Sequence, residues 1–307
     1  RIKKSRPPLL MKESLSSLIF PGNIEDDLHH LDDADWIVEA VVERIDIKKS
    51  IYKKIDSRRK KTALVSSNTS SIPLKVLTEE MSDSMKTVFC ITHFFNPVRY
   101  MRLLELVITE LNDRDKIQQL EKFCDERLGK SVVVCNDSPG FLGNRVGVYA
   151  MQVAMTEAFK LELSVEEADA IFGRPMGIPK TGVFGLYDLI GIDLMADVLK
   201  SFVKELPLED PFHQVGKDLP LIKKLINDGY TGRKGKGGFF RMNKENNIKI
   251  LESLNYKTHS YNPSKKIDLS LPDLMNIEHL LTREDVYGEY AWNILKKTIL
   301  YAANLVP

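Results

Sequence analysis

Over the first 136 positions, hydrophobic residues gather in short runs that are separated by charged, helical patterns. The runs lie at 33–43 (DADWIVEAVVE), 62–66 (TALVS), 87–92 (TVFCIT), 103–109 (LLELVIT) and 131–135 (SVVVC). Apolar runs of this length are typical of strands that are buried on both faces of a sheet. Ile47, Ile51 and Ile55 recur at helical spacing after the first run, and 73–81 and 113–128 are also amphipathic. This alternation predicts an α/β sheet with crossover helices.

The pattern changes at 135–145 (CNDSPGFLGNR), and helical periodicity continues from there to about residue 230. Ser164 and Glu167 form a capping box at the start of one of these helices. A glycine-rich basic turn follows at 232–240. The predicted organisation is an α/β domain, a helical domain, an extended polar linker and the truncated start of a second helical repeat, over 1–136, 137–241, 242–282 and 283–307. The last helix is apolar on one side, and the chain offers no clear partner for that side.

Composition excludes several classes of function. The 307 residues are 43% hydrophobic and 28% charged, with a net charge of +1, which is typical of soluble globular proteins and gives no electrostatic case for nucleic-acid binding. No apolar run is long enough to span a membrane, and RIKKSRPPLL at the start lacks the apolar core of a signal peptide. Cys90, Cys124 and Cys135 form no CxxC pair, so we expect buried, reduced thiols in a cytoplasmic protein without a metal site.

Polar turns follow three of the predicted strands: SNTSS (67–71), HFFNP (93–97) and DSPGFLGNR (137–145). Ligands of open α/β sheets bind outside the carboxyl ends of the strands, so these turns are where a site is expected. His93 would face such a cleft. Glu105 would lie among apolar residues of the neighbouring strand, where a carboxylate needs a partner. An imidazole with a carboxylate suggests a general base and its orienting group. The alternative is a core histidine and a surface glutamate on an edge strand.

Five segments together resemble the 3-hydroxyacyl-CoA dehydrogenase family, in family order and spacing. They are SNTSS (67–71), THFFNPVRYMRLLELV (92–107), DSPGFLGNR (137–145), EEADAIFGRPMGIPKTGVFGLYDLIGID (166–193) and GYTGRKGKGGFF (229–240). The chain is most similar to the dehydrogenase part of large bacterial fatty-acid oxidation proteins, which also carry a hydratase. The resemblance implies a Rossmann-like parallel sheet followed by an all-helical C-terminal domain. It also implies NAD-dependent oxidation of 3-hydroxyacyl-CoA to 3-oxoacyl-CoA in β-oxidation.

The resemblance assigns roles to individual positions. His93 would take the proton of the 3-hydroxyl group, Glu105 would hold its imidazole, Asn144 would hydrogen-bond the substrate oxygens, and Ser70 would touch the substrate hydroxyl or carbonyl. The implied NAD contacts are Glu43, Lys48, Ser70, Asn96 and Lys234.

Each of these positions also has a structural interpretation. Ser70 could cap the next helix, Asn144 could cap a helix that begins near Phe141, Lys48 could lie on a solvated helix face, and Lys234 could be a mobile loop charge.

The family's GxGxxG turn, which binds pyrophosphate at a helix N-terminus, has no match in the sequence. We therefore expect a sheet that lacks its first βαβ unit, and NAD is not distinguished from NADP. A second hypothesis follows: a non-catalytic fragment, or one subunit of a split enzyme that needs a separate N-terminal polypeptide. A third hypothesis, a hydroxyacid dehydrogenase with a lysine base, fits the histidine of HFFNP poorly. Expected partners are an acyl-CoA substrate, a second copy of the chain and a hydratase polypeptide.

Overall fold

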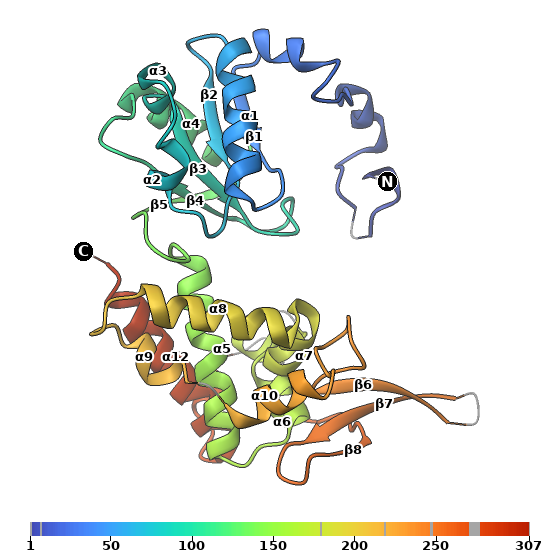
Figure 1. Ribbon diagram of the computed structural model, residues 1–307. Coiled ribbons are helices and arrows are strands. Elements are labelled where there is room, and N and C mark those ends of the chain that lie inside the picture. Colours follow the sequence, from blue (N-terminus) through green and yellow to red (C-terminus); the bar gives the residue numbers. More distant parts are fainter. Residues whose placement is uncertain are drawn as a thin grey trace. The chain divides into compact units, whose positions relative to one another are not determined.

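The computed structural model describes residues 2–6, 8–178, 180–217, 219–245, 248–269 and 277–306 (Figure 1). The chain folds into two compact units, Arg1–Gly143 and Asn144–Pro307. We call them the N-terminal unit and the C-terminal unit. The sequence placed a domain boundary between residues 136 and 137, a few residues before this division.

A five-stranded sheet in the order β1-β2-β3-β4-β5 forms the centre of the N-terminal unit. Its strands are β1 Trp36–Glu39, β2 Leu64–Ser67, β3 Phe89–Phe94, β4 Leu103–Val107 and β5 Ser131–Cys135. Each lies in one of the five predicted apolar runs or overlaps it. The pairs β1·β2, β2·β3 and β4·β5 are parallel.

The sheet is therefore mainly parallel, as predicted, but the pair β3·β4 is antiparallel, which the sequence analysis did not anticipate. Only residues 95–102 connect the two strands. A parallel crossover needs about a dozen residues or more, so this connection is too short to return the chain to the other end of the sheet. Strand β5 therefore runs opposite to β1, β2 and β3.

Helices cover both faces of this sheet (Figure 1). The helices of the whole N-terminal unit are η1 Ile2–Lys4, η2 Glu13–Leu18, η3 Leu28–Asp32, α1 Ile45–Arg58, α2 Leu74–Thr78, α3 Asp83–Lys86 and α4 Arg114–Glu126, and η1 and η2 lie apart from the sheet. Phe89 and Ile91 of β3 pack with residues of α1 and α2, whereas Cys90 between them packs with α4. This alternation is the period of two expected for a strand buried on both faces.

The C-terminal unit is built mainly from helices around one apolar core. Its helices are α5 Gly143–Lys160, α6 Val165–Ile171, η4 Arg174–Met176, α7 Gly182–Ile190, α8 Ile192–Glu205, α9 Phe212–Val215, α10 Pro220–Asn227, α11 Ile277–Leu281 and α12 Val286–Ala303. The capping box of Ser164 and Glu167 is present at the start of α6. No helix of the described residues has the length and apolarity that a membrane crossing requires.

Much of the predicted linker 242–282 is folded, which is a correction. The strands β6 Phe240–Glu245, β7 Ile248–Asn255 and β8 Ser260–Pro263 form an antiparallel sheet. Leu254 is 3% exposed, and Ser253 donates a hydrogen bond to Glu166 of α6. An antiparallel sheet can leave one face in water, so its strands can be polar enough to resemble a linker. Positions 270–276 of the predicted linker lie outside the described residues.

The last helix also differs from its prediction, because α12 finds a partner inside its own unit. Tyr290 is 0% exposed and its hydroxyl donates to the carbonyl oxygen of Ala154 on α5 at 3.0 Å. Ile294, one turn later, is 2% exposed. The apolar side of α12 is therefore part of the core of the C-terminal unit.

Candidate active site

His93 and Glu105 are directly opposite each other on the adjacent strands β3 and β4. His93 Nδ1 lies 2.6 Å from Glu105 Oε2. Both side chains project to the sheet face that also carries Ile91 and Val107, because alternate residues of a strand share a face. The predicted pair is thus in contact, and the register of two strands holds it together.

Glu105 is fully buried, with an exposed fraction of 0%, and β4 lies between β3 and β5. This excludes the alternative of a surface glutamate on an edge strand. Its Oε1 accepts backbone hydrogen bonds from Leu142 at 2.8 Å and from Gly143 at 2.6 Å, where α5 begins. Backbone N–H groups at a helix start stabilise a negative charge, so the buried carboxylate is stabilised on both of its oxygens.

The second ring nitrogen of His93, Nε2, has no hydrogen bond to any residue in the described part of the chain. The ring is 6% exposed and lies beside Phe95 and Phe141, with centroid distances of 4.5 Å and 5.9 Å. The contact of Nδ1 with a carboxylate assigns the proton to Nδ1, which leaves a lone pair on Nε2. This geometry provides an oriented imidazole that can accept one proton.

Glu43, Ser70 and Asn96 follow the carboxyl ends of β1, β2 and β3. Because these three strands are parallel, the residues after them lie along one edge of the sheet. His93 is near the end of β3 at the same edge, where Phe94 N–H donates to Asn68 Oδ1 at 3.0 Å. The structure therefore gathers four of the predicted site residues where open α/β sheets bind ligands.

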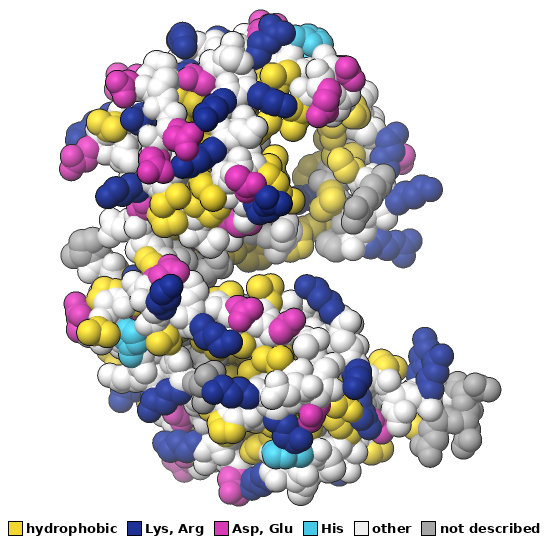
Figure 2. Space-filling view, in the orientation of Figure 1, with side chains coloured by type: hydrophobic (Ala, Val, Ile, Leu, Met, Phe, Trp, Pro, Cys, Tyr) yellow, Lys and Arg dark blue, Asp and Glu magenta, His cyan; other side chains and the backbone are white. Residues whose placement is uncertain are grey.

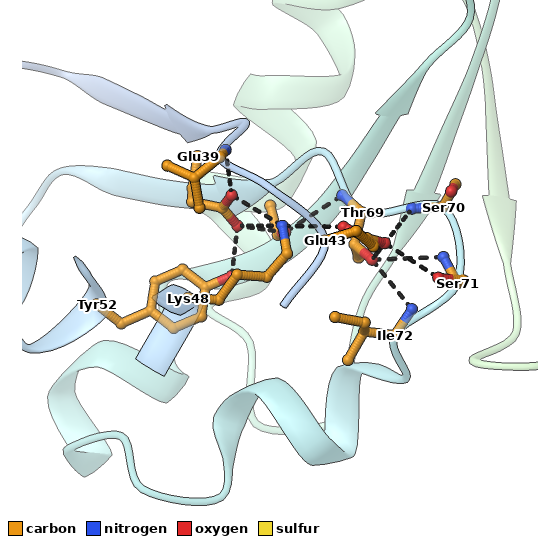
Figure 3. A network of polar contacts seen from close by, with 10 residues as sticks. Glu39, Glu43, Lys48, Tyr52, Thr69, Ser70, Ser71 and Ile72 are labelled. Carbon is orange, nitrogen blue, oxygen red and sulfur yellow. Dashed lines mark hydrogen bonds and ion pairs between the residues drawn. The ribbon is translucent and has the colours of Figure 1, made fainter. Parts of the chain in front are cut away.

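Lys48 belongs to a buried polar network behind this edge (Figure 3). Its Nζ contacts Glu39 Oε1 and Oε2 at 2.8 Å and 3.0 Å and Glu43 Oε2 at 3.1 Å. Tyr52 donates to Glu39 Oε2 at 2.6 Å, and Ser67 donates to the same oxygen at 2.7 Å. Lys48 is 0% exposed, so it does not lie on a solvated helix face.

Glu43 connects this network to the turn that carries Ser70. Its Oε1 accepts from the Thr69 hydroxyl, the Ser70 N–H and the Ser71 hydroxyl. Burial raises the pKa of Glu43, but hydrogen bonds from Thr69 and Lys48 outweigh burial and leave that pKa below its ordinary value. The Ser70 hydroxyl points away from Glu43 (Figure 3) and has no hydrogen bond within the described residues.

These groups suit the ribose and carboxamide parts of a dinucleotide. The Glu43 side chain is 38% exposed, and Asn96 is exposed with an amide that makes no hydrogen bond to the described residues. With the unpaired Ser70 hydroxyl, they offer donors and acceptors of the kind that bind ribose and carboxamide groups. Lys48, by contrast, has no exposed surface, and its direct contact with a cofactor stays a prediction.

Asn144 and Lys234 lie in the C-terminal unit. Asn144 is the second residue of α5, it has no side-chain hydrogen bond to the described residues, and it does not cap the helix. Lys234 is exposed in the loop between α10 and β6. The roles of these two residues stay predictions.

The turn at 137–145 reaches the sheet in a way that the sequence did not predict. β5 runs antiparallel to β2 and β3, so its carboxyl end points away from the edge that is formed by the carboxyl ends of those strands. Instead, Asp137 accepts from the backbone N–H groups of Leu74 and Lys75, and the residues after Phe141 donate to Glu105. Phe141 has a positive φ of 48°, which turns the chain before α5.

Glu39, Tyr52 and Ser67 were missed by the sequence interpretation. Glu39 was read as part of an apolar strand, and Tyr52 as part of an amphipathic helix. Glu39 is a carboxylate inside a buried apolar run, which is the same signal that singled out Glu105. It could have been found in the same way.

Charged side chains of both signs are interspersed on the face shown in Figure 2, over both units. This fits the near-neutral composition.

Comparison with protein families gives two matches that cover most of the chain. Residues 2–138 match the 3-hydroxyacyl-CoA dehydrogenase NAD binding domain, and residues 140–242 match the 3-hydroxyacyl-CoA dehydrogenase C-terminal domain.

Individual relatives agree with these matches. A putative fatty acid oxidation complex trifunctional enzyme of Rickettsia felis is 40% identical over 100% of the chain, but the chain spans only 42% of that relative. A probable 3-hydroxyacyl-CoA dehydrogenase of Deinococcus radiodurans is 36% identical over 80% of the chain and 70% of its own length. The crystal structure of (S)-3-hydroxybutyryl-CoA dehydrogenase from Ralstonia eutropha superposes with a TM-score of 0.56 at 29% identity, covering 69% of this chain and 72% of that one.

Proposed function

The chain belongs to the 3-hydroxyacyl-CoA dehydrogenase family, and from this premise we propose that it oxidises the 3-hydroxyl group of a 3-hydroxyacyl-CoA thioester in fatty-acid β-oxidation. NAD, when bound, supplies the hydride acceptor, and the carbon that loses hydride becomes the carbonyl of a 3-oxoacyl-CoA. The observation that carries the proposal is the His93–Glu105 pair, with one ring nitrogen held at 2.6 Å and the other unpaired.

In this mechanism His93 Nε2 accepts the proton of the 3-hydroxyl group as the C–H bond breaks. The imidazolium that forms is stabilised by Glu105, whose charge is already held by two backbone N–H groups. Phe95 and Phe141 beside the ring limit the access of water. Ser70 and Asn144 would orient the substrate oxygen, and Glu43, Asn96 and Lys234 would hold the cofactor.

A second candidate function is that of one component in an enzyme built from two polypeptides. β1 is at the edge of the sheet, and the segment before it carries exposed apolar side chains, with Leu18 at 70% and Phe20 at 82%. A second polypeptide that added a strand to this edge would pair its open backbone groups, and the exposed apolar side chains offer it further surface. A second copy of the chain, bound through the C-terminal unit, remains part of the proposal.

The test is NADH oxidation by the purified chain with acetoacetyl-CoA, beside His93→Gln and the control His30→Gln. His30 is exposed and lies outside the site. We expect turnover by the wild-type chain and by the control, and a loss of about 10²- to 10⁴-fold in His93→Gln, as for the removal of a general acid–base group. Wild-type turnover in His93→Gln would contradict the role of the histidine. A folded wild-type sample without turnover would favour the two-polypeptide candidate.

A further inference from the structure

Asn144 is the proposed substrate contact on α5, and its side chain is not held in place by hydrogen bonds of its own to the described residues. The amide makes no hydrogen bond to any residue in the described ranges. Its orientation therefore depends on the backbone of the first turn of α5, and on whatever holds that turn in place.

The next residue, Arg145, is anchored on two sides. Its Nε donates to the hydroxyl of Tyr301 on α12 at 2.9 Å, and its Nη2 donates to the Asp210 carboxylate in the segment between α8 and α9. The Tyr301 hydroxyl donates in turn to Asp210 Oδ1 at 3.1 Å. The three side chains form a closed ring of hydrogen bonds, which we call the Arg145–Asp210–Tyr301 ring.

This ring is shielded from water and rigid. The side chains of Arg145 and Asp210 are 13% and 5% exposed, and Tyr301 is 1% exposed. Asp210 Oδ1 also accepts from the backbone N–H of Phe212 at 2.8 Å. A planar guanidinium held by two partners has little freedom to rotate, so the residue that carries it is fixed as well.

Tyr301 also contacts α5 at a second position. Its ring stacks on that of Tyr149, with centroids 4.0 Å apart and an interplanar angle of 10°. Tyr149 is one helical turn after Arg145. A single side chain of α12 thus holds two successive turns of α5, directly beside Asn144.

Stability alone is a weak reason for such a ring, because a buried ion pair often contributes no more than apolar residues of equal volume. We propose that Arg145, Asp210 and Tyr301 are positioning residues, which orient the first turn of α5 so that the Asn144 amide meets the oxygens of the acyl-CoA substrate. The inference rests on the proposed function. It gives α12 a part in catalysis, although no residue of that helix needs to touch the substrate.

The test is a double-mutant cycle between Tyr301→Phe and Asn144→Ala, read as kcat for acetoacetyl-CoA reduction. Tyr301→Phe removes the hydroxyl and keeps the ring on Tyr149. We expect kcat to fall about 10- to 100-fold, as for a misplacement of about 1 Å in a catalytic group. The Michaelis constant for NADH should stay unchanged. In the Asn144→Ala background, Tyr301→Phe should lower kcat no further, because the residue that it positions is gone.

The matched control is Tyr149→Phe. Its hydroxyl has no hydrogen bond within the described residues, so this variant keeps the stack and leaves the ring intact. We expect its kcat within about twofold of wild type, as for a substitution that breaks no interaction. Asp210→Asn is a second way to weaken the ring if Tyr301→Phe proves unstable by circular dichroism, and the same kcat loss is expected.

The outcomes distinguish a failure of the positioning role from a failure of the proposed function. Wild-type turnover that is lost in His93→Gln, together with an unchanged kcat in Tyr301→Phe and Asp210→Asn, would overturn the positioning role and leave the proposed function standing. Effects of Tyr301→Phe and Asn144→Ala that simply multiply would also overturn it, because independent effects indicate a general structural role. A folded wild-type chain without turnover would overturn both.

Discussion

The Lys48–Glu39 and His93–Glu105 pairs of the N-terminal unit are both buried, but they differ in which polar atoms they leave unpaired. In the Lys48–Glu39 pair, each carboxylate oxygen accepts at least two hydrogen bonds, and the ammonium contacts Glu43 as well. In the His93–Glu105 pair both carboxylate oxygens also have partners, but one ring nitrogen is open. The Lys48–Glu39 pair leaves no lone pair free for a proton, whereas the His93–Glu105 pair can also exchange one.

The Glu105→Gln variant should have the largest effect of the substitutions that test the difference between the two pairs. The amide oxygen would accept from the N–H groups of Leu142 and Gly143, and the NH₂ group would then face His93 Nδ1. The imidazole would have to carry its proton on Nε2, which removes the lone pair that accepts the substrate proton. We expect kcat for 3-hydroxybutyryl-CoA oxidation to fall about 10³- to 10⁴-fold, as for a carboxylate that orients a catalytic histidine. The control is Glu126→Gln, at an exposed position of α4.

If Glu105→Gln kept kcat within tenfold of wild type, the carboxylate would not set the state of the imidazole. The distinction between an open and a closed pair would then have no functional meaning.

Lys48→Met tests the closed pair. The variant leaves the buried Glu39 carboxylate without a cation, and breaking a buried pair in this way costs about 3–5 kcal/mol of unfolding free energy. Urea denaturation followed by circular dichroism measures the loss. The control is Lys54→Met, an exposed lysine on the same helix, for which a change within about 0.5 kcal/mol is expected. Equal losses in the two variants would show that Glu39 does not depend on Lys48.

Tyr52→Phe removes one donor from the closed network and leaves its charges in place. The Tyr52 hydroxyl donates to Glu39 Oε2 at 2.6 Å, and burial, together with this hydrogen bond, raises the pKa of the phenol. A hydrogen bond to a charged group contributes about 1.5–3 kcal/mol, so the expected loss in unfolding free energy is smaller than for Lys48→Met. An unchanged denaturation midpoint would mean that the other donors to Glu39 suffice.

Glu43 is the partly exposed member of the network around Lys48, so we expect its contribution to stability to be the smallest. Its folded-state pKa lies below the ordinary value of 4.5, so ionised Glu43 adds stability above that pH. The contribution is lost as the pH falls through the lowered folded-state pKa. We expect Glu43→Gln to flatten the fall in stability below pH 4.5, measured by urea denaturation in an acid series. An identical acid limb in both proteins would contradict this linkage.

The sequence located the sheet well, because strands buried on both faces require apolar runs, and all five runs became strands. It also located His93 and Glu105, since a carboxylate inside such a run requires a partner. The antiparallel β3·β4 pair was missed, although the connection between the two runs is visibly too short for a parallel crossover. The alternative of a solvated Lys48 is wrong, because a lysine in an amphipathic helix normally marks the solvated face but here pairs with a buried glutamate. The sheet β6–β8 was missed because only a few of its residues, such as Leu254, are buried.

The antiparallel register of β3 and β4 has a consequence for insertions and deletions. His93 and Glu105 meet because they are opposite each other in a ladder, so their separation along the chain is set by the connection 95–102 and not by the chemistry. Changes of length within that connection can leave the pair intact. A one-residue insertion inside either strand would turn one of the two side chains to the opposite face of the sheet. The contact between the two residues therefore tolerates a change in their spacing along the chain better than a change in the ladder that joins them.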